Sequence, residues 1–98
     1  MKTILDGFKD SNESWYSEYL GSCNASSVNF RIMNNKEAKF HVHENQEEMF
    51  IVISGTLFID FDDEMIQLEA GDSYTVKSGV KHRARAIGKV KLLVIGGT

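Results

Sequence analysis

The sequence predicts an all-β protein, an antiparallel barrel or a jelly roll, and three observations support this. From Ser27 onward, short β-type runs alternate with turn signals. The runs recur at the short spacing that is typical of barrels and sandwiches, and no convincing long helix interrupts them. The chain has 98 residues, a length that suits one domain.

Each expected strand is a β-type run that ends at a turn signal. The first four are Val28–Met33 before a turn at 34–36, Lys39–His43 before a polar break at 44–46, Glu48–Ile53 before Ser54–Gly55, and Thr56–Phe61 before Asp62–Asp63. The other four are Glu64–Leu68 before a turn at 70–72, Ser73–Val76 before Ser78–Gly79, His82–Ile87 before Gly88, and Lys89–Ile95.

The N-terminal part of the chain has a different character. We expect residues 1–26 to form a separate segment and residues 27–98 to form the barrel domain. Within the segment, residues 8–20 mix aromatic and polar residues without a clean period. They predict either a short helix capped near Ser11 or Asn12, or a loop with a terminal strand. We expect this segment to pack on the barrel or on the partner of a homodimer.

Composition excludes several classes of function. The formal net charge of −3 argues against nucleic acid, because phosphate binding needs a basic face. The single cysteine, Cys23, cannot form an intrachain disulfide and fits a reducing compartment. The first ten residues do not resemble a signal peptide, and no apolar stretch approaches the roughly 20 residues that span a bilayer. We therefore expect a cytoplasmic protein that does not bind a membrane.

The three histidines of the chain predict a metal site. His41 and His43 are separated by one residue on an expected strand, so their side chains point the same way. An acidic residue follows within a few positions, and His82 opens another expected strand. Three imidazoles and a carboxylate suit a divalent transition metal, and four ligands leave up to two octahedral positions open. A single histidine on a strand is usually structural, so the full spacing has to decide.

The first half of this spacing resembles a conserved motif of the cupin superfamily, G-x5-H-x-H-x3,4-E-x6-G. His41, His43, Glu48 and Gly55 match the motif, and its leading glycine falls at Asn35. Asparagine also tolerates a positive φ, so this departure is mild.

The second half resembles the other cupin motif, G-x5-P-x-G-x2-H-x3-N. Gly71, Gly79 and His82 match, whereas Lys77 replaces the proline and Ala86 replaces the asparagine. These departures remove a rigid turn and a polar group, and they affect none of the four ligands that the motifs specify.

The resemblance implies a cupin-type double-stranded β-helix, a jelly-roll barrel with the metal inside. It implies one divalent transition metal (Fe, Mn, Ni or Zn), a small-molecule ligand or substrate, and a homodimer formed through N-terminal strands. The implied ligands are His41, His43, Glu48 and His82. Glu47 competes with Glu48, but the six-residue gap to Gly55 selects Glu48.

Strand alternation gives the expected lining of the site. Glu48 shares a face with Phe50 and Val52, and Ala84 and Ala86 should point inward with His82. Arg83 and Arg85 then point outward, as solvated surface charges.

The expected lining is small and apolar, so no general acid or base is evident beyond the metal. Tyr74, Arg31 and Glu47 are the remaining candidates, their facing is open, and we assign no catalytic residue. Dioxygenase-like oxidation of a small molecule fits best, because the ion itself carries that chemistry. The alternatives are a non-enzymatic small-ligand or sugar-binding module and a metal-dependent sugar isomerase or epimerase.

Overall fold

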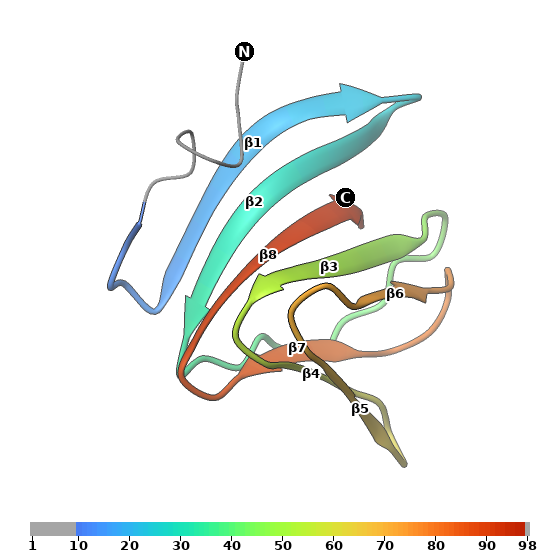
Figure 1. Cartoon of the computed structure of the whole chain (residues 1–98). Helices are drawn as coiled ribbons and strands as arrows, with labels where there is room; N and C mark the ends of the chain where they lie inside the picture. The colour runs from blue at the N-terminus through green and yellow to red at the C-terminus, as the bar shows by residue number, and fades with distance from the viewer. Residues whose placement is uncertain (1–9, 98) are drawn as a thin grey trace.

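The computed structural model describes residues 10–97, which form eight antiparallel β-strands and no helix (Figure 1). The strands are β1 (Trp15–Cys23), β2 (Ser26–Asn34), β3 (Glu48–Ser54), β4 (Leu57–Asp60), β5 (Met65–Leu68), β6 (Ser73–Val76), β7 (Arg83–Ala86) and β8 (Lys89–Gly96). The predicted all-β class is confirmed. No helix among the described residues is long and apolar enough to cross a membrane.

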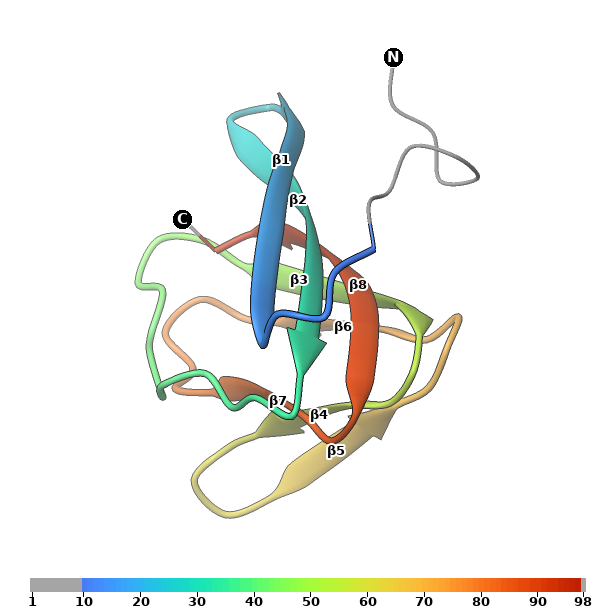
Figure 2. The ribbon, with the colours of Figure 1, turned by 90° about the vertical axis from the view of Figure 1, so that its left-hand side faces the viewer.

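The strands form two sheets that face each other as a jelly-roll barrel (Figures 1 and 2). The larger sheet has the order β1-β2-β8-β3-β6, and the smaller has the order β5-β4-β7. The core lies between them. Its buried side chains are Met33, Phe50, Val52, Leu57, Ile59, Leu68, Val76, Ala84, Ala86, Val90, Leu92 and Val94.

Alternation along the strands decides which side chains reach this core. On β8, every second residue from Val90 to Val94 is buried in the core. On β7, Ala84 and Ala86 point inward as predicted, opposite the large side chains Ile59 and Leu57 of β4. Small residues on β7 therefore pair with large ones on β4.

The alternation on β2 runs opposite to its hydrophobic pattern. Phe30 and Ile32 are fully buried, but they pair with Leu93 and Lys91 of β8, which point away from the core. The inward face of β2 therefore carries Arg31 instead.

The helical alternative for the N-terminal segment is wrong. Residues 15–23 form β1, which pairs with β2 along its length, as the terminal-strand alternative predicts. Aromatic residues favour a strand when a neighbouring strand is available, and Tyr16 packs its ring edge-on against Phe30 at 6.5 Å between centroids. Phe8, part of the predicted pattern, lies outside the described residues.

The predicted strand at Lys39–His43 is also wrong. This segment follows β7 through backbone hydrogen bonds from Ala38 to Ala84 and from His41 to His82, but it forms only isolated bridges. Three residue steps on this side, from 38 to 41, correspond to two steps on the opposite segment, from 84 to 82. The extra residue interrupts the ladder as a bulge does, so a regular strand cannot form.

Candidate metal centre

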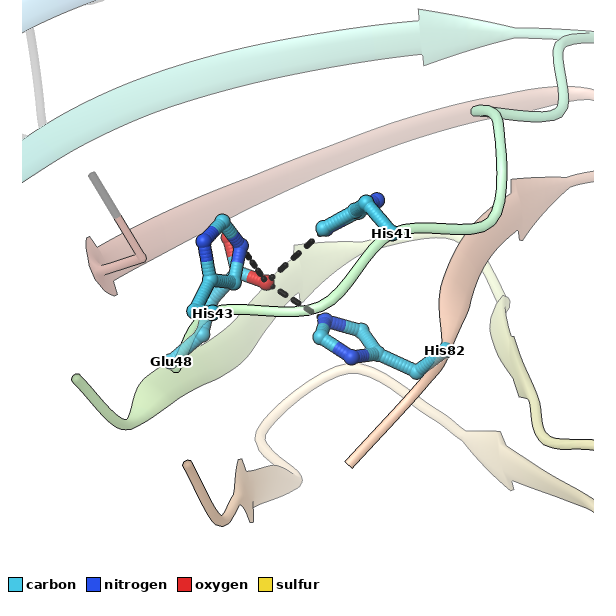
Figure 3. A group of neighbouring side chains, drawn as sticks. All are labelled: His41, His43, Glu48 and His82. Carbon is cyan, nitrogen blue, oxygen red and sulfur yellow. Dashed lines mark hydrogen bonds and ion pairs between the residues drawn. The ribbon is translucent and has the colours of Figure 1, made fainter. Parts of the chain in front are cut away.

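Four side chains that are distant in the sequence meet at one point of the barrel (Figure 3). His41 and His43 come from the irregular segment before β3, Glu48 is the first residue of β3, and His82 directly precedes β7. Each offers one ligand atom, and these atoms all lie within 4.8 Å of one another. It is the one group of this kind that the described residues contain.

The carboxylate of Glu48 is the centre of the group. Its Oε1 lies 2.7 Å from Nε2 of His82, 3.4 Å from Nε2 of His43 and 3.5 Å from Nε2 of His41. Glu48 and His82 are buried, whereas His41 and His43 are partly exposed. The three imidazoles therefore present the same ring nitrogen to the same small volume.

Backbone carbonyls orient two of these rings. Nδ1 of His41 lies 2.8 Å from the carbonyl of Lys39, and Nδ1 of His82 lies 2.8 Å from the carbonyl of Val80. Because a carbonyl can only accept, Nδ1 carries the proton, and Nε2 is the nitrogen that remains for a metal. This second hydrogen bond is typical of histidines that bind metals.

Short-range backbone contacts hold the histidine segments together. His41 and His82 exchange two backbone hydrogen bonds of 3.0 Å each. The N–H of Gly79 donates to the carbonyl of His43 at 2.8 Å, and Gly79 has a φ of 81°, which glycine adopts without strain. The turn that carries the second motif is thereby attached directly to the segment that carries the first.

Burial and charge act against each other in this group. Burial raises the pKa of Glu48, but the hydrogen bond from His82 and the charges of the three histidines outweigh it and lower the pKa. Burial lowers the pKa of His82, but the hydrogen bonds to Glu48 and to the carbonyl of Val80 outweigh it and raise the pKa. The group therefore favours an ionised carboxylate with positive charge beside it, the arrangement that a cation completes.

The residues present fit a divalent transition metal. His43 Nε2 is buried and has no hydrogen-bond partner among the described residues, so it is an unsatisfied polar atom that a metal ion would satisfy. Three imidazoles and one carboxylate are a donor set for Fe, Mn, Ni or Zn. The structure brings together the four predicted ligands, and their role as ligands stays a prediction.

Glu47 lies outside this group. Its carboxylate is exposed and pairs with Nζ of Lys77 at 3.0 Å. Neighbouring residues on a strand point to opposite faces, so only one of the two adjacent glutamates can reach the histidines, and it is Glu48.

A cavity of about 280 Å³ adjoins the group. Its lining is formed by Trp15, Arg31, Ala38, Lys39, His41, His43, Glu48, Phe50, Ala84 and Gly97. The expected apolar wall is present in Ala38, Phe50 and Ala84, but the expectation was incomplete. Arg31, one of the three candidates whose facing the sequence left open, also lines the cavity, and so does Trp15, which sequence reasoning did not assign to it.

The other candidates point elsewhere. Tyr74 packs edge-on against Phe61 at 6.2 Å between ring centroids. Arg83 and Arg85 point outward as predicted, but they are not simply solvated, because the Nε of each donates to Oδ2 of Asp60 at 2.8 Å.

Comparison with known proteins agrees with this architecture. The family model of the cupin domain matches residues 28–96. A cupin-2 domain containing protein from Shewanella frigidimarina NCIMB 400 has a crystal structure with a TM-score of 0.79 and 32% identity, over 87% of this chain and 82% of that chain. A cupin superfamily protein from Desulfitobacterium hafniense DCB-2 gives a TM-score of 0.83 at 17% identity, over 95% and 85% of the two chains.

A curated relative is the uncharacterized protein YdbB of Bacillus subtilis (strain 168). It is 43% identical over 51 residues, which are 51% of this chain and 45% of that protein. The match therefore spans less than half the length of that relative.

The fold and the site together define this chain as a small jelly-roll barrel protein with a candidate metal centre of three histidines and one glutamate. The family match covers most of the described strands, and the relative from Shewanella exceeds 30% identity over most of both chains. The chain belongs to the cupin family.

Proposed function

We propose that this cupin binds one divalent transition-metal ion through His41, His43, Glu48 and His82 and presents it to a small molecule. The observation that carries the proposal is the convergence of the four ligand atoms, including a buried His43 Nε2 without a hydrogen bond, at the wall of a cavity. At about 280 Å³ the cavity is near the lower end of the range for ligand pockets, so the molecule must be small.

We infer that the reaction is a dioxygenase-like oxidation, in which both atoms of O2 enter the organic molecule. A redox-active ion, when bound, would supply the electron exchange with O2, and four protein ligands leave up to two octahedral positions open. Apart from the four candidate ligands, the cavity lining contains no carboxylate and no imidazole. The protein is therefore suited to bind and orient a molecule rather than to transfer its protons.

One observation favours a second candidate. Lys39 lines the cavity and is exposed, so an amine stands where a metal-dependent sugar isomerase or epimerase would need a base. A non-enzymatic small-ligand or sugar-binding module is the third reading. The identity of the bound metal separates an enzyme from a binding module, because Fe, Mn or Ni favours the enzyme and Zn favours binding.

Metal content tests the site. We expect Glu48→Gln and His82→Ala to lower the metal-to-protein ratio at least tenfold, measured by elemental analysis of protein purified without a nickel column. Glu47→Gln is the matched control, because it makes the same change on the neighbouring, outward-facing residue and should keep the full ratio. Equal metal in all three variants would overturn the site.

The reaction needs its own test. Wild-type protein loaded with Fe(II) should consume O2 in the presence of a small substrate, and the same protein loaded with Zn should not. Metal binding without O2 consumption by any metal form, across a panel of small acids and sugars, would support the binding module instead.

We also propose that the partner is a second copy of this chain and that the protein is cytoplasmic. The outward face of β3 and β8 carries the partly exposed apolar side chains Met49, Ile51, Leu93 and Ile95, which suits a sheet covered by a dimer partner. The free, exposed Cys23 suits a reducing compartment. Sedimentation equilibrium tests the dimer, since a mass of one chain at micromolar concentration would contradict it.

A further inference from the structure

Arg31 is a half-buried cation on the inner wall of the barrel, and its Nε is buried. It lies on β2 opposite Leu92 of β8, and Leu92 belongs to the core, so the two side chains point inward together. Arg31 lines the same cavity as His41, His43 and Glu48. A positive charge therefore shares the cavity with the candidate metal centre.

The side chain of Arg31 makes no hydrogen bond within the part of the chain that the structure describes. Its Nε is buried and makes no hydrogen bond there. The other two arginines of the chain, Arg83 and Arg85, both donate to Asp60. Burial lowers the pKa of Arg31, and the charge of Glu48 offsets part of this effect. Because a buried charge is costly unless it is paired, Arg31 lacks an anion.

Glu48 does not fill this role. Its Oε1 accepts a hydrogen bond from His82 at 2.7 Å and faces the two other histidines. A carboxylate that is committed to three imidazoles acts on Arg31 only through its charge. The described residues therefore supply no hydrogen-bond acceptor for the Arg31 guanidinium.

Trp15 shapes what Arg31 can bind. The guanidinium carbon lies 4.3 Å from the centroid of the Trp15 ring, and Trp15 is 37% exposed at the edge of the same cavity. A cation–π contact uses none of the guanidinium N–H groups as a hydrogen-bond donor, so they stay available. The planar fork of the guanidinium then favours a flat, two-oxygen acceptor.

We propose that Arg31 is the anion-binding residue of the cavity and that its ligand is a small monocarboxylic acid. The carboxylate pairs with the Arg31 guanidinium, and a neighbouring keto or hydroxyl oxygen reaches toward His41, His43 and Glu48. This second contact rests on the proposed metal function, whereas the Arg31 contact does not.

A carboxylate fits better than a phosphate for two reasons. One guanidinium matches one negative charge, and its planar fork matches two oxygens of a carboxylate. A phosphate near pH 7 carries more than one negative charge, which a single guanidinium does not balance.

The test uses the full chain loaded with Zn and three probes. These are pyruvate, hydroxyacetone as its uncharged counterpart, and inorganic phosphate. Trp15 is the only tryptophan, so its emission reports binding beside Arg31, and calorimetry gives the same affinity independently. We expect pyruvate to bind at least tenfold more tightly than hydroxyacetone or phosphate.

Variants assign this preference to Arg31. We expect Arg31→Gln to weaken pyruvate binding at least tenfold and Arg31→Lys to lie between it and wild type, because lysine keeps the charge but loses the fork. Arg83→Gln, on the outer face, should bind pyruvate like wild type. The zinc content of Arg31→Gln should equal that of wild type.

The outcomes are distinguishable. Equal affinity for pyruvate and hydroxyacetone, or no effect of Arg31→Gln on pyruvate binding, would overturn the anion site. Arg31-dependent binding of phosphate as tight as that of pyruvate would overturn the proposal that the ligand is a carboxylic acid. If wild type takes up no zinc, the proposed function fails separately. Arg31-dependent pyruvate binding by that zinc-free protein would still support the anion site.

Discussion

Gly97 lies directly against the carboxylate of Glu48. A Cβ atom at this position would overlap with Oε2 and Cδ of the Glu48 side chain, and the φ of Gly97 is 71°, which side chains rarely adopt. Its N–H donates to the carbonyl of Glu47 at 3.2 Å, which holds the glycine in place. The chain after β8 thereby sets how far the Glu48 carboxylate can move from the three histidines.

Gly97→Ala should disturb the metal centre from outside its set of ligands. The new methyl group has to displace the Glu48 carboxylate, so we expect a several-fold lower metal affinity, measured by competition with a chelator. Gly88→Ala is the matched control, because Gly88 has a φ of 76° but nothing within 4 Å of the added Cβ. Both variants should lose about 1 kcal/mol of stability to backbone strain. A loss of metal affinity equal in both would contradict this role of Gly97.

The sequence predicts the ligand cluster well because spacing and strand alternation act on the same residues. Glu48, Phe50 and Val52 share an inward face, and Asn35, where the motif has glycine, does adopt a positive φ of 47°. The segment around His41 was predicted as a strand because it has β-type composition. Its bulge could not be foreseen, since it depends on how the segment aligns with β7.

Arg31 shows where the sequence pattern leaves a facing open. Val28, Phe30 and Ile32 alternate with Arg31, and the sequence alone does not decide which of the two sets points inward. In the fold, Phe30 and Ile32 are buried on the other face of the sheet and Arg31 turns inward. A sheet that is covered on both faces hides its orientation, because both sets of side chains can be apolar. No local signal in the sequence decides which face of the sheet Arg31 occupies.

Arg31→Met should stabilise the protein. The change replaces a half-buried cation, whose buried Nε makes no hydrogen bond among the described residues, by an apolar side chain of similar length. It also removes the contact with Trp15. We expect a gain of about 1 kcal/mol in the free energy of unfolding, or a Tm higher by about 4–8 °C. Thermal unfolding followed by circular dichroism measures it. Arg83→Met is the comparison and should lower Tm, since it breaks a 2.8 Å hydrogen bond to Asp60. A lower Tm for Arg31→Met would contradict the interpretation that the charge of Arg31 is unpaired.

Asp60 should make stability depend on acid pH. The hydrogen bond from Arg85 lowers its pKa below the ordinary value of 3.8, burial opposes this, and Arg83 adds to the lowering. A lowered pKa means that the stabilisation is complete above pH 3.8 and is lost as the pH falls through the folded-state pKa. We expect Asp60→Asn to cost about 1–2 kcal/mol at pH 7, because hydrogen bonds to charged groups are lost, and less at pH 3, where part of this stabilisation is gone. Urea unfolding at both values tests this.

Asp62→Asn serves as the control for that experiment. Asp62 is exposed, and its Oδ1 lies 3.8 Å from Nζ of Lys81, a distance too long for a hydrogen bond. Its stability should stay within about 0.5 kcal/mol of wild type at both pH values. A pH-independent cost for Asp60→Asn would mean that its packing, and not its charge, stabilises the small sheet.

The stabilities of two Asn35 variants should separate two effects, backbone strain and a side-chain hydrogen bond. Its φ of 47° favours glycine, but its Oδ1 also accepts the N–H of Gly88 at 2.7 Å. Asn35→Gly keeps the backbone relaxed and loses this hydrogen bond, at a cost of about 0.5–1.5 kcal/mol. Asn35→Ala loses the bond and adds a left-handed strain of about 1 kcal/mol, so it should be the less stable of the two. Equal stability of both variants in urea unfolding would mean that the strain is absent, whereas a glycine variant as stable as wild type would mean that the Gly88 bond contributes nothing.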